Sequence, residues 1–436
     1  MIKSKKIINL RKYLVVFFSG ITISVAIIGT ACSTAVSVTQ TTFSNQIPSN
    51  TVYETIHNLE YSLLIINSDL NSNGTAVLGT SWLFDYQLND ASDNITCYFA
   101  TNLHVADGLH NPLDFNHQDD KSNLRTQEFY LGKYDVDPNS QLSSIALNKN
   151  ITYYKVGENA QAQGINNLPK TQFIAVDPST TTYIDFAVLA MTFNKNDLIY
   201  KNWILNSINQ LNKLVEHPTL GSSYVDILFP SQNFLFKNNF GKQIIETNLK
   251  DCRAYIAGYP YYDTNVKSRF YNDYPIVNGG GLWTINEPLN EARQPIDNKF
   301  QGQTFDTNKS SENPPYEFIQ IAPGVYNPWG LSNWRIKYHG TEYAQSGLGY
   351  IVNNSNISGG SSGSVLMNQK FQIMGIYYGS WQYETSDKVR HDVPYGLCQI
   401  LRHNVGSPIS AYDLIAGNTN SYKQSLENTK TWLFSV

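Results

Sequence analysis

This chain of 436 residues has few cysteines and a small net charge, and each feature argues against a class of protein. The chain has four cysteines, namely Cys32, Cys97, Cys252 and Cys398. The three that follow Cys32 are odd in number and lie in apolar surroundings typical of buried thiols, so they predict no disulfide framework. Lysine and arginine total 31 against 35 acidic residues, and the resulting charge of −4 gives no indication of a nucleic-acid partner.

The motifs of metal and phosphate sites are also missing. No C-x-x-C pair and no paired-histidine spacing indicates zinc. Gly279-Gly280-Gly281 lacks the Lys and Ser/Thr that complete a phosphate-binding loop, and it predicts a turn. His110 and His117 with Asp119 and Asp120 make either a loose metal cluster or a solvated loop, and we favour the loop. The sequence therefore predicts no metal and no cofactor.

The N-terminus has the pattern of an export signal. Residues 1–12 carry five basic side chains without an acid, and 13–31 are largely apolar up to Thr30-Ala31-Cys32. The pattern predicts a lipoprotein signal peptide over 1–31, cut before a lipidated Cys32, although Gly29 makes the lipobox a loose one. An uncleaved membrane anchor is the alternative. In either case the rest of the chain is expected at the cell membrane, on the extracellular face.

A polar stretch separates this signal from the body of the chain. Residues 32–50 are rich in Ser, Thr, Asn and Gln, too polar to bury a core, and predict a tether. Beyond them, 51–436 is long enough for a sizeable core, since the whole chain is 41% hydrophobic and 13% aromatic.

The coarse secondary structure is mostly β. Short β-branched and aromatic runs, separated by Asn, Asp and Gly, predict antiparallel strands. They are Tyr61–Asn67, Ala76–Asp85, Ile95–Thr101, Gln127–Leu131, Phe186–Met191, Ala254–Gly258, Phe318–Ile321, Gly349–Val352, Gly363–Met367 and Gln372–Tyr378. Apolar residues at helical spacing predict an amphipathic helix within 196–216. Two short terminal helices are expected at 411–416 and 422–434.

One stretch has the composition of a nucleophile turn. Gly359-Gly360-Ser361-Ser362-Gly363-Ser364 places small residues on both sides of Ser362, which lets the backbone turn sharply and aim adjacent N–H groups at one point. A flexible loop is the simpler interpretation of such a run. A catalytic serine also needs a histidine to take its proton and a carboxylate to orient that histidine.

Both partners are present in suitable contexts. His104 ends the strand-like run 98–104, and Asp185 is set into the apolar segment 183–189, where a buried carboxylate needs a partner. Each residue alone is more often structural than catalytic. The three together, in the order His104, Asp185, Ser362, support a catalytic triad.

That order is the order of chymotrypsin-like proteases. Three motifs resemble those of the bacterial trypsin-like enzymes, namely Thr101-Asn102-Leu103-His104-Val105, Asp185-Phe186-Ala187-Val188-Leu189 and Gly360-Ser361-Ser362-Gly363-Ser364. Ala257-Gly258-Tyr259-Pro260 resembles a strand-end motif of the glutamyl endopeptidases, and Ile373-Met374-Gly375-Ile376-Tyr377-Tyr378-Gly379 resembles the strand that walls the primary specificity pocket. The arrangement of Gly79-Thr80-Ser81-Trp82-Leu83-Phe84 followed by 99–106, behind a lipoprotein leader, resembles the mycoplasma lipoprotein serine peptidase family, which includes the immunoglobulin proteases.

The resemblance implies a chymotrypsin-like double β-barrel with a helical insertion and C-terminal helices. The first barrel would span 51–192, the linker and helical insertion 193–250, the second barrel 251–405 and the C-terminal helices 406–436. His104 and Asp185 would come from the first barrel and Ser362 from the second, which places the triad between them.

The resemblance also assigns the remaining site residues. Backbone N–H groups of Gly360 and Ser362 would form the oxyanion hole, and Tyr377, Tyr378 and Gly379 would line the substrate pocket. Ser361 stands where trypsin-type zymogens carry an Asp, so activation by an ion pair with a freed N-terminus is not expected. Tyr377 and Tyr378 stand where glutamyl endopeptidases place a histidine, which argues against glutamate specificity.

The implied function is a cell-surface serine endopeptidase acting on protein or peptide substrates. Host immunoglobulin, with help from a separate capture protein, is one hypothesis for the substrate, and general cleavage of host or medium protein is the broader one. A catalytically inactive protease-fold adhesin or antibody-binding module is the alternative. A solute-binding lipoprotein is disfavoured because repeated βαβ patterning is absent.

Overall fold

The computed structural model describes most of the chain beyond the expected tether. The described residues are 52–69, 74–88, 92–111, 124–134, 151–160, 165–215, 224–231, 236–239, 242–245, 254–260, 284–285, 316–321, 326–327, 330–331, 334–338, 340–353, 357, 359–384, 390–405 and 409–434. The expected signal peptide, Cys32 and the tether lie outside them. So do Cys252, His117, Asp119, Asp120 and Gly279-Gly280-Gly281.

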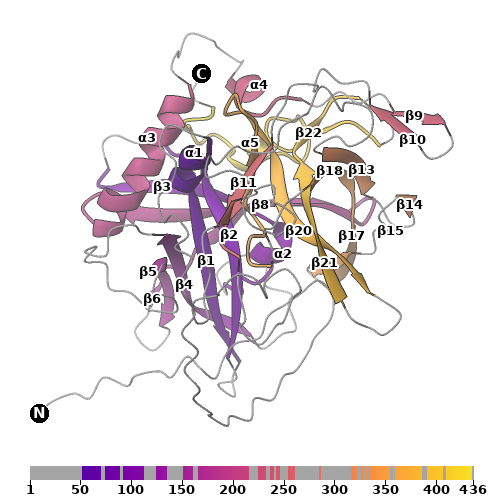
Figure 1. Ribbon diagram of the computed structural model, residues 1–436. Coiled ribbons are helices and arrows are strands. Elements are labelled where there is room, and N and C mark those ends of the chain that lie inside the picture. The colour runs from indigo at the N-terminus through magenta and orange to yellow at the C-terminus, as the bar shows by residue number, and fades with distance from the viewer. Residues whose placement is uncertain are drawn as a thin grey trace, which may run out of the picture.

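A ten-stranded sheet carries the first half of the chain (Figure 1). Its strands are β1 (Glu60–Ser68), β2 (Gly74–Tyr86), β3 (Asn94–Thr101), β4 (Arg125–Tyr134), β5 (Ile151–Ala160), β6 (Ile165–Asn166), β7 (Lys170–Asp177), β8 (Thr182–Asn194), β16 (Arg335–Tyr338) and β17 (Thr341–Gln345). The order is β16-β17-β8-β3-β2-β1-β4-β5-β6, and β7 also pairs with β8. Antiparallel pairing dominates, and the contact of β17 with β8 is parallel.

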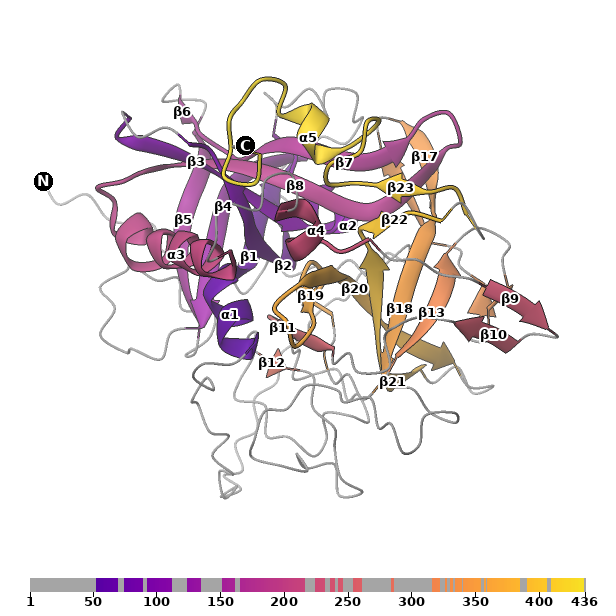
Figure 2. The same ribbon diagram turned by 90° about the horizontal axis from the view of Figure 1, so that it is seen from above.

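A seven-stranded sheet carries the second half, and Figure 2 shows the two sheets side by side. Its strands, in spatial order, are β12 (Thr284–Ile285), β11 (Tyr255–Gly258), β19 (Val365–Met367), β20 (Ile373–Glu384), β21 (Arg390–Ile400), β18 (Gly347–Asn353) and β13 (Tyr316–Ile321). Three two-stranded pairs complete the strands, namely β9 (Phe236–Asn239) with β10 (Lys242–Ile245), β14 (Tyr326–Asn327) with β15 (Gly330–Leu331), and β22 (Arg402–His403) with β23 (Tyr412–Asp413).

The mostly β prediction is confirmed, and each of the ten predicted runs overlaps a strand. Within the run 363–367, however, Gly363 and Ser364 belong to a turn, and the strand begins at Val365. The division into two barrels, and the closure of each sheet into a barrel, stay predictions.

The β16–β17 hairpin ties the two sheets together. It falls within the range expected for the second barrel, yet Ala344 of β17 pairs with Thr182 in the first sheet. The chain then runs directly into β18 of the second sheet, and the Ser346 N–H donates to the Tyr183 carbonyl at 2.7 Å. This crossing holds the second sheet against the end of β8 that carries Asp185.

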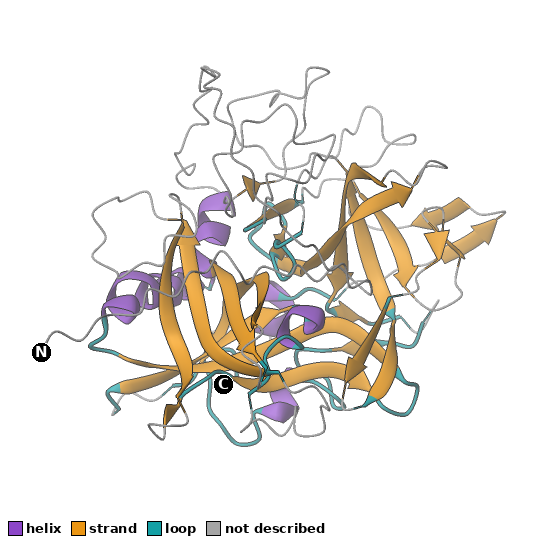
Figure 3. Ribbon diagram, turned by 90° about the horizontal axis from the view of Figure 1, so that it is seen from below, coloured by secondary structure: helices purple, strands orange, loops and turns teal. Residues whose placement is uncertain are grey.

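In the described part of the chain, five short α-helices accompany the sheets (Figure 3): α1 (Val52–Leu59), α2 (Leu103–Ala106), α3 (Leu205–Leu214), α4 (Tyr224–Leu228) and α5 (Tyr422–Ser425). The helix predicted within 196–216 is confirmed, but its part Tyr200–Ile204 is π-helical. A π turn holds an extra residue, which rotates the apolar stripe. Ile204 and Leu211 are buried as expected, while Leu198 and Leu205 are 51% and 38% exposed. None of the described helices is long and apolar enough to cross a membrane.

The predicted terminal helix at 411–416 is wrong, and the one at 422–434 is shorter than predicted. Residues 411–416 form β23 and a turn, because the Asp413 carboxylate accepts the N–H groups of Ile415 and Ala416, both at 2.9 Å, and bends the chain there. In 422–434 the helix stops at Ser425.

A buried acid explains why the last segment leaves the helix. Asp85 of β2 is 0% exposed and accepts the Leu433 N–H at 2.9 Å and the Tyr422 hydroxyl at 3.1 Å. Burial raises the pKa of Asp85 to about 7, although these hydrogen bonds favour its charged form. The Trp432 N–H also donates to the Tyr86 carbonyl at 2.9 Å, so this segment runs along the end of β2.

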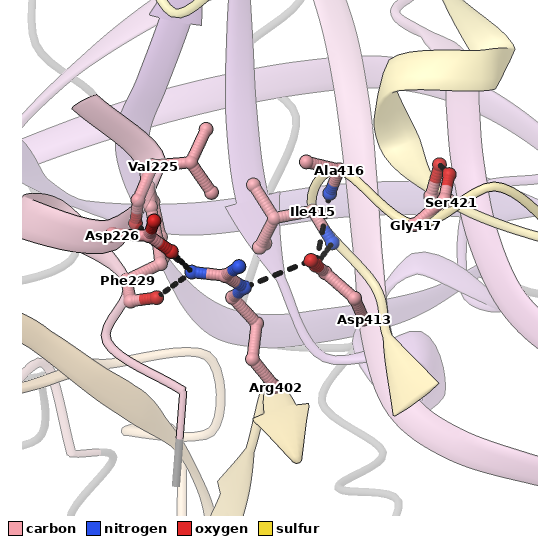
Figure 4. A network of polar contacts seen from close by, with 9 residues as sticks. All are labelled: Val225, Asp226, Phe229, Arg402, Asp413, Ile415, Ala416, Gly417 and Ser421. Carbon is pink, nitrogen blue, oxygen red and sulfur yellow. Dashed lines mark hydrogen bonds and ion pairs between the residues drawn. The ribbon is translucent and has the colours of Figure 1, made fainter. Parts of the chain in front are cut away.

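A second polar anchor joins α4 to the C-terminal region (Figure 4). The Arg402 side chain, 10% exposed, donates from Nε to Asp413 at 2.9 Å and from the guanidinium to Asp226 at 2.9 Å. The same guanidinium donates to the carbonyls of Val225, at 3.2 Å, and Phe229. One planar, always charged group thus satisfies four acceptors, as arginine geometry allows.

Replacing Arg402 with methionine is expected to lower the free energy of unfolding by about 3 kcal/mol, because buried acceptors lose their donor. Arg335→Met is the matched control. The Arg335–Glu342 pair is 50% and 64% exposed, and its loss is expected to cost less than about 1 kcal/mol. Urea unfolding followed by circular dichroism measures both, and equal losses would contradict the anchor.

Candidate functional site

The structure brings His104 and Asp185 together where β3 ends beside β8 in the first sheet. β3 ends at Thr101, and α2 lifts His104 over the neighbouring β8, where Asp185 is fully buried. The His104 Nδ1–H donates to one carboxylate oxygen of Asp185 at 2.7 Å, and the His104 backbone N–H donates to the other at 3.0 Å. Asn102 also bonds to β8, because its side-chain amide donates to the Asp185 carbonyl at 2.8 Å.

This pairing fixes one tautomer of the ring. Because Nδ1 donates its hydrogen to the carboxylate, Nε2 of neutral His104 carries the available lone pair and can accept a proton. The His104 side chain is 32% exposed while Asp185 is 0% exposed. The ring therefore has an accessible edge and a buried, charged partner.

The pKa of His104 lies above its ordinary value of 6.5. Burial by itself lowers this pKa. The charge and hydrogen bond of Asp185, and then the charge of Asp107, raise it, and together they outweigh the effect of burial.

The raised pKa gives a pH test of whether His104 acts as a general base. In that role the neutral ring would be the active form, so kcat/KM is expected to rise with pH and to reach half its plateau above pH 6.5. Asp107→Asn is expected to move that midpoint to lower pH, because it removes a charge that favours the imidazolium. A pH–rate profile of both proteins checks this, and an unmoved midpoint would contradict the assigned role of Asp107.

The serine turn has the backbone shape that its composition predicts. Gly360 and Gly363 have φ angles of +94° and +101°, which only glycine adopts at little cost. Ser362, between them, is 9% exposed and donates its hydroxyl to the Tyr378 carbonyl at 3.4 Å. No hydrogen bond joins the hydroxyl to His104 among the described residues. Such contacts often form only when substrate is bound.

Hydrogen bonds within the serine turn, and one to β20, fix the orientation of its peptide groups. The Ser361 carbonyl accepts the N–H of Ser364 at 3.0 Å and its hydroxyl at 2.7 Å. Because N–H and C=O of a trans peptide point in opposite directions, the Ser362 N–H is turned away from Ser364. The Gly363 N–H donates to the Tyr377 carbonyl at 2.8 Å.

The turn lies directly against the segment that carries His104. A β-carbon added to Gly363 would stand 1.9 Å from the Thr80 carbonyl oxygen and 2.6 Å from the Thr101 hydroxyl oxygen. Thr101 is three residues before His104. The serine from the second half of the chain and the histidine from the first are thus brought to one place.

The expected pocket residues lie on β20 beside this turn. The Tyr377 side chain is fully buried in the core of the second sheet, where its hydroxyl donates to the Ile357 carbonyl at 2.8 Å. The Tyr378 side chain is 4% exposed and meets Trp334 edge to face at 5.3 Å between ring centres. A β-carbon at Gly379 would stand 2.8 Å from the Trp334 ring. The aromatic side chain nearest Gly379 is therefore Trp334.

Sequence reasoning missed three supporting residues. Glu60, fully buried, accepts the Val365 N–H at 2.9 Å just after the serine turn, Thr80 bonds to the turn itself, and Trp334 covers β20. An acid at the head of the apolar run 61–67 was a signal for Glu60, because such a charge needs a partner. Thr80 lies within the motif 79–84 that carried the family resemblance, but nothing local assigned it to the serine turn, and nothing local distinguishes Trp334.

Fold and site together define a mostly β, two-sheet protein in which a buried carboxylate orients a histidine beside a serine turn. A comparison with known families is specific. The model described as mycoplasma immunoglobulin protease matches residues 50–379, and the chain belongs to that family.

The relatives found are lipoproteins by name. An uncharacterized lipoprotein of Mycoplasmoides gallisepticum is 29% identical, covering 87% of this chain and 78% of its own length. One of Mycoplasma pneumoniae is 28% identical, covering 90% and 83%, and one of Mycoplasma genitalium is 26% identical, covering 87% and 85%. Among solved structures, one described as that of the mycoplasma MIB and MIP proteins matches with a TM-score of 0.43 and 15% identity. That match spans 83% of this chain and 60% of the other.

Proposed function

We propose that this protein is a serine endopeptidase of the mycoplasma immunoglobulin protease family, with His104, Asp185 and Ser362 as its triad. The observation that carries the proposal is the double contact of the buried Asp185 carboxylate with the His104 ring and the His104 backbone N–H. A purely structural histidine does not require a buried carboxylate partner and an accessible second nitrogen beside a serine turn.

In this mechanism Ser362 attacks the peptide carbonyl carbon while Nε2 of His104 takes the hydroxyl proton. The backbone N–H groups of Gly360 and Ser362 bind the resulting oxyanion, and such a donor stabilises a transition state by about 3 kcal/mol. Protonated His104 then gives its proton to the leaving amine, which breaks the peptide bond and leaves an acyl-enzyme. Water, deprotonated by His104, hydrolyses the ester and restores Ser362.

The substrate is a protein or peptide, and the backbone of Tyr377, Tyr378 and Gly379 on β20 would line its pocket beside Ser362, since the Tyr377 side chain itself is buried in the core. The family's name makes immunoglobulin the first protein to test, both alone and with a separate capture protein. A lipidated Cys32 would hold the enzyme on the extracellular face of the cell membrane, a proposal supported by the lipoprotein names of the relatives.

Labelling by a serine-directed fluorescent phosphonate tests the proposal. The full chain, purified in detergent, is incubated with the reagent, digested and mapped by mass spectrometry. We expect a single adduct on Ser362. The labelling rate is expected to decrease as the pH is lowered through the pKa of His104. A mixed-sequence peptide library and intact immunoglobulin, incubated with the same preparation, then identify the cleaved bonds.

Labelling after thermal unfolding is the control, because the reagent requires an assembled triad. A folded protein with no adduct and no cleavage would overturn the endopeptidase proposal and would favour an inactive binding module. An adduct spread over several serines would equally count against Ser362 as an activated nucleophile.

A further inference from the structure

Thr80 of β2 makes two hydrogen bonds to the serine turn. It is fully buried, its N–H donates to the Ser362 carbonyl at 2.8 Å, and its hydroxyl donates to the Gly360 carbonyl at 3.0 Å. The Tyr259 N–H donates to the same hydroxyl oxygen at 3.1 Å. The Thr80 hydroxyl therefore has one donor and one acceptor partner, both backbone, which leaves it a single orientation.

The other side of Thr80 is tied to the histidine segment. The Thr101 hydroxyl donates to the Thr80 carbonyl at 2.8 Å, and Thr101 is fully buried. The next residue, Asn102, bonds to the Asp185 backbone. One residue of the first sheet thus connects the strand ends that present His104 and Asp185 with the turn that presents Ser362.

The residues that Thr80 holds are the two expected to supply oxyanion donors. Gly360 lacks a β-carbon and has a positive φ, so the 360–361 peptide that follows it can rotate at little cost. Such a rotation would also tilt the two adjoining peptides, 359–360 and 361–362, which carry the donor N–H groups of Gly360 and Ser362. A hydrogen bond to the Gly360 carbonyl opposes that rotation. Donors act on a developing charge only if they are in place beforehand, so a misplaced donor lowers kcat more than it changes KM.

We propose that the Thr80 hydroxyl is a positioning group of the active site, which holds the turn 360–362 in the orientation that its oxyanion donors need. The proposal rests on the proposed endopeptidase function for its kinetic part. Its structural part, the fixing of the turn, is independent of that function.

Thr80→Val removes the hydroxyl and keeps the shape of the side chain, and Thr80→Ser restores the hydroxyl. With a peptide taken from the library, we expect Thr80→Val to lower kcat about 10- to 100-fold with KM within about twofold of wild type. Thr80→Ser is expected to recover kcat to within about threefold. Amide exchange of 359–365 is expected to be faster in Thr80→Val than in wild type and to be slowed again in Thr80→Ser.

Thr126→Val is the matched control for lost stability. Thr126 is also fully buried; its hydroxyl accepts the His110 N–H at 2.8 Å and donates to Asn67 at 2.7 Å, and neither bond reaches the serine turn. We expect it to lower the unfolding midpoint as Thr80→Val does while kcat and the exchange of 359–365 stay at wild-type values.

The outcomes separate the two proposals. If Thr80→Val leaves both kcat and the exchange of 359–365 unchanged, or changes them no more than Thr126→Val does, the positioning role is wrong. If wild type proves unreactive while Thr80→Val still speeds exchange in 359–365 and Thr80→Ser reverses it, the fixing of the turn stands and the endopeptidase function falls.

Discussion

Ser362→Ala is expected to reduce kcat for peptide cleavage about 10⁶-fold, the largest effect of any single substitution in this protein. Alanine cannot form the acyl-enzyme, so only the residual effect of substrate binding and the oxyanion donors remains. The fold should be unaffected, since the hydroxyl makes one long contact, 3.4 Å, to the Tyr378 carbonyl. Steady-state cleavage of the best library peptide, with phosphonate labelling in parallel, measures the loss.

The adjacent serine supplies the control. Ser361 is fully buried, and its hydroxyl has no hydrogen-bond partner among the described residues. Ser361→Ala is expected to keep kcat within about threefold of wild type. A protein that loses activity with Ser361→Ala and keeps it with Ser362→Ala would show that the nucleophile has been assigned to the wrong serine.

Asp185→Asn is expected to reduce kcat about 10⁴-fold. The carboxylate now accepts from both the His104 ring and the His104 backbone N–H. An amide has one oxygen, and if that oxygen keeps the backbone N–H, its NH₂ group faces Nδ1. The ring must then carry its proton on Nε2, where it cannot accept the proton of Ser362.

The Asp185→Asn measurement is kcat across pH 6 to 9, because a changed tautomer lowers the plateau and a simple pKa change only moves the midpoint. Asp177→Asn is a suitable control. That acid precedes β8 and contacts the exposed Ser179, so kcat should stay within about twofold of wild type. An Asp185→Asn protein with more than about a tenth of wild-type kcat would contradict the triad.

The sequence predicted the parts of the fold that depend on local pattern. Runs rich in β-branched and aromatic residues identified ten of the 23 described strands, because burial on a pleated surface selects these residue types, but they missed long strands such as β5, β7 and β21. The local sequence pattern did not predict which strands pair with one another. The β16–β17 hairpin shows this, since it joins the first sheet through Thr182 although its neighbours in sequence belong to the second.

Local periodicity also failed where tertiary contacts changed the backbone. The helix within 196–216 has a π turn at Tyr200–Ile204, which leaves Leu205 exposed against the predicted stripe. The segment after Ser425 leaves the helix because the buried Asp85 takes the Leu433 N–H, a partner almost 350 residues away in the chain. Propensity carries no information on such a partner.

At the site, the sequence by itself determined which residue types are present and in what setting: a histidine at a strand end, an acid in an apolar strand and a serine between glycines. Only the tertiary structure decided their geometry. It placed the Asp185 carboxylate on two N–H groups of His104, and it set Thr80 and Glu60 against the serine turn. The physical reason is that a buried polar group must find a partner wherever the fold supplies one, and that partner is fixed by strand pairing across the whole chain.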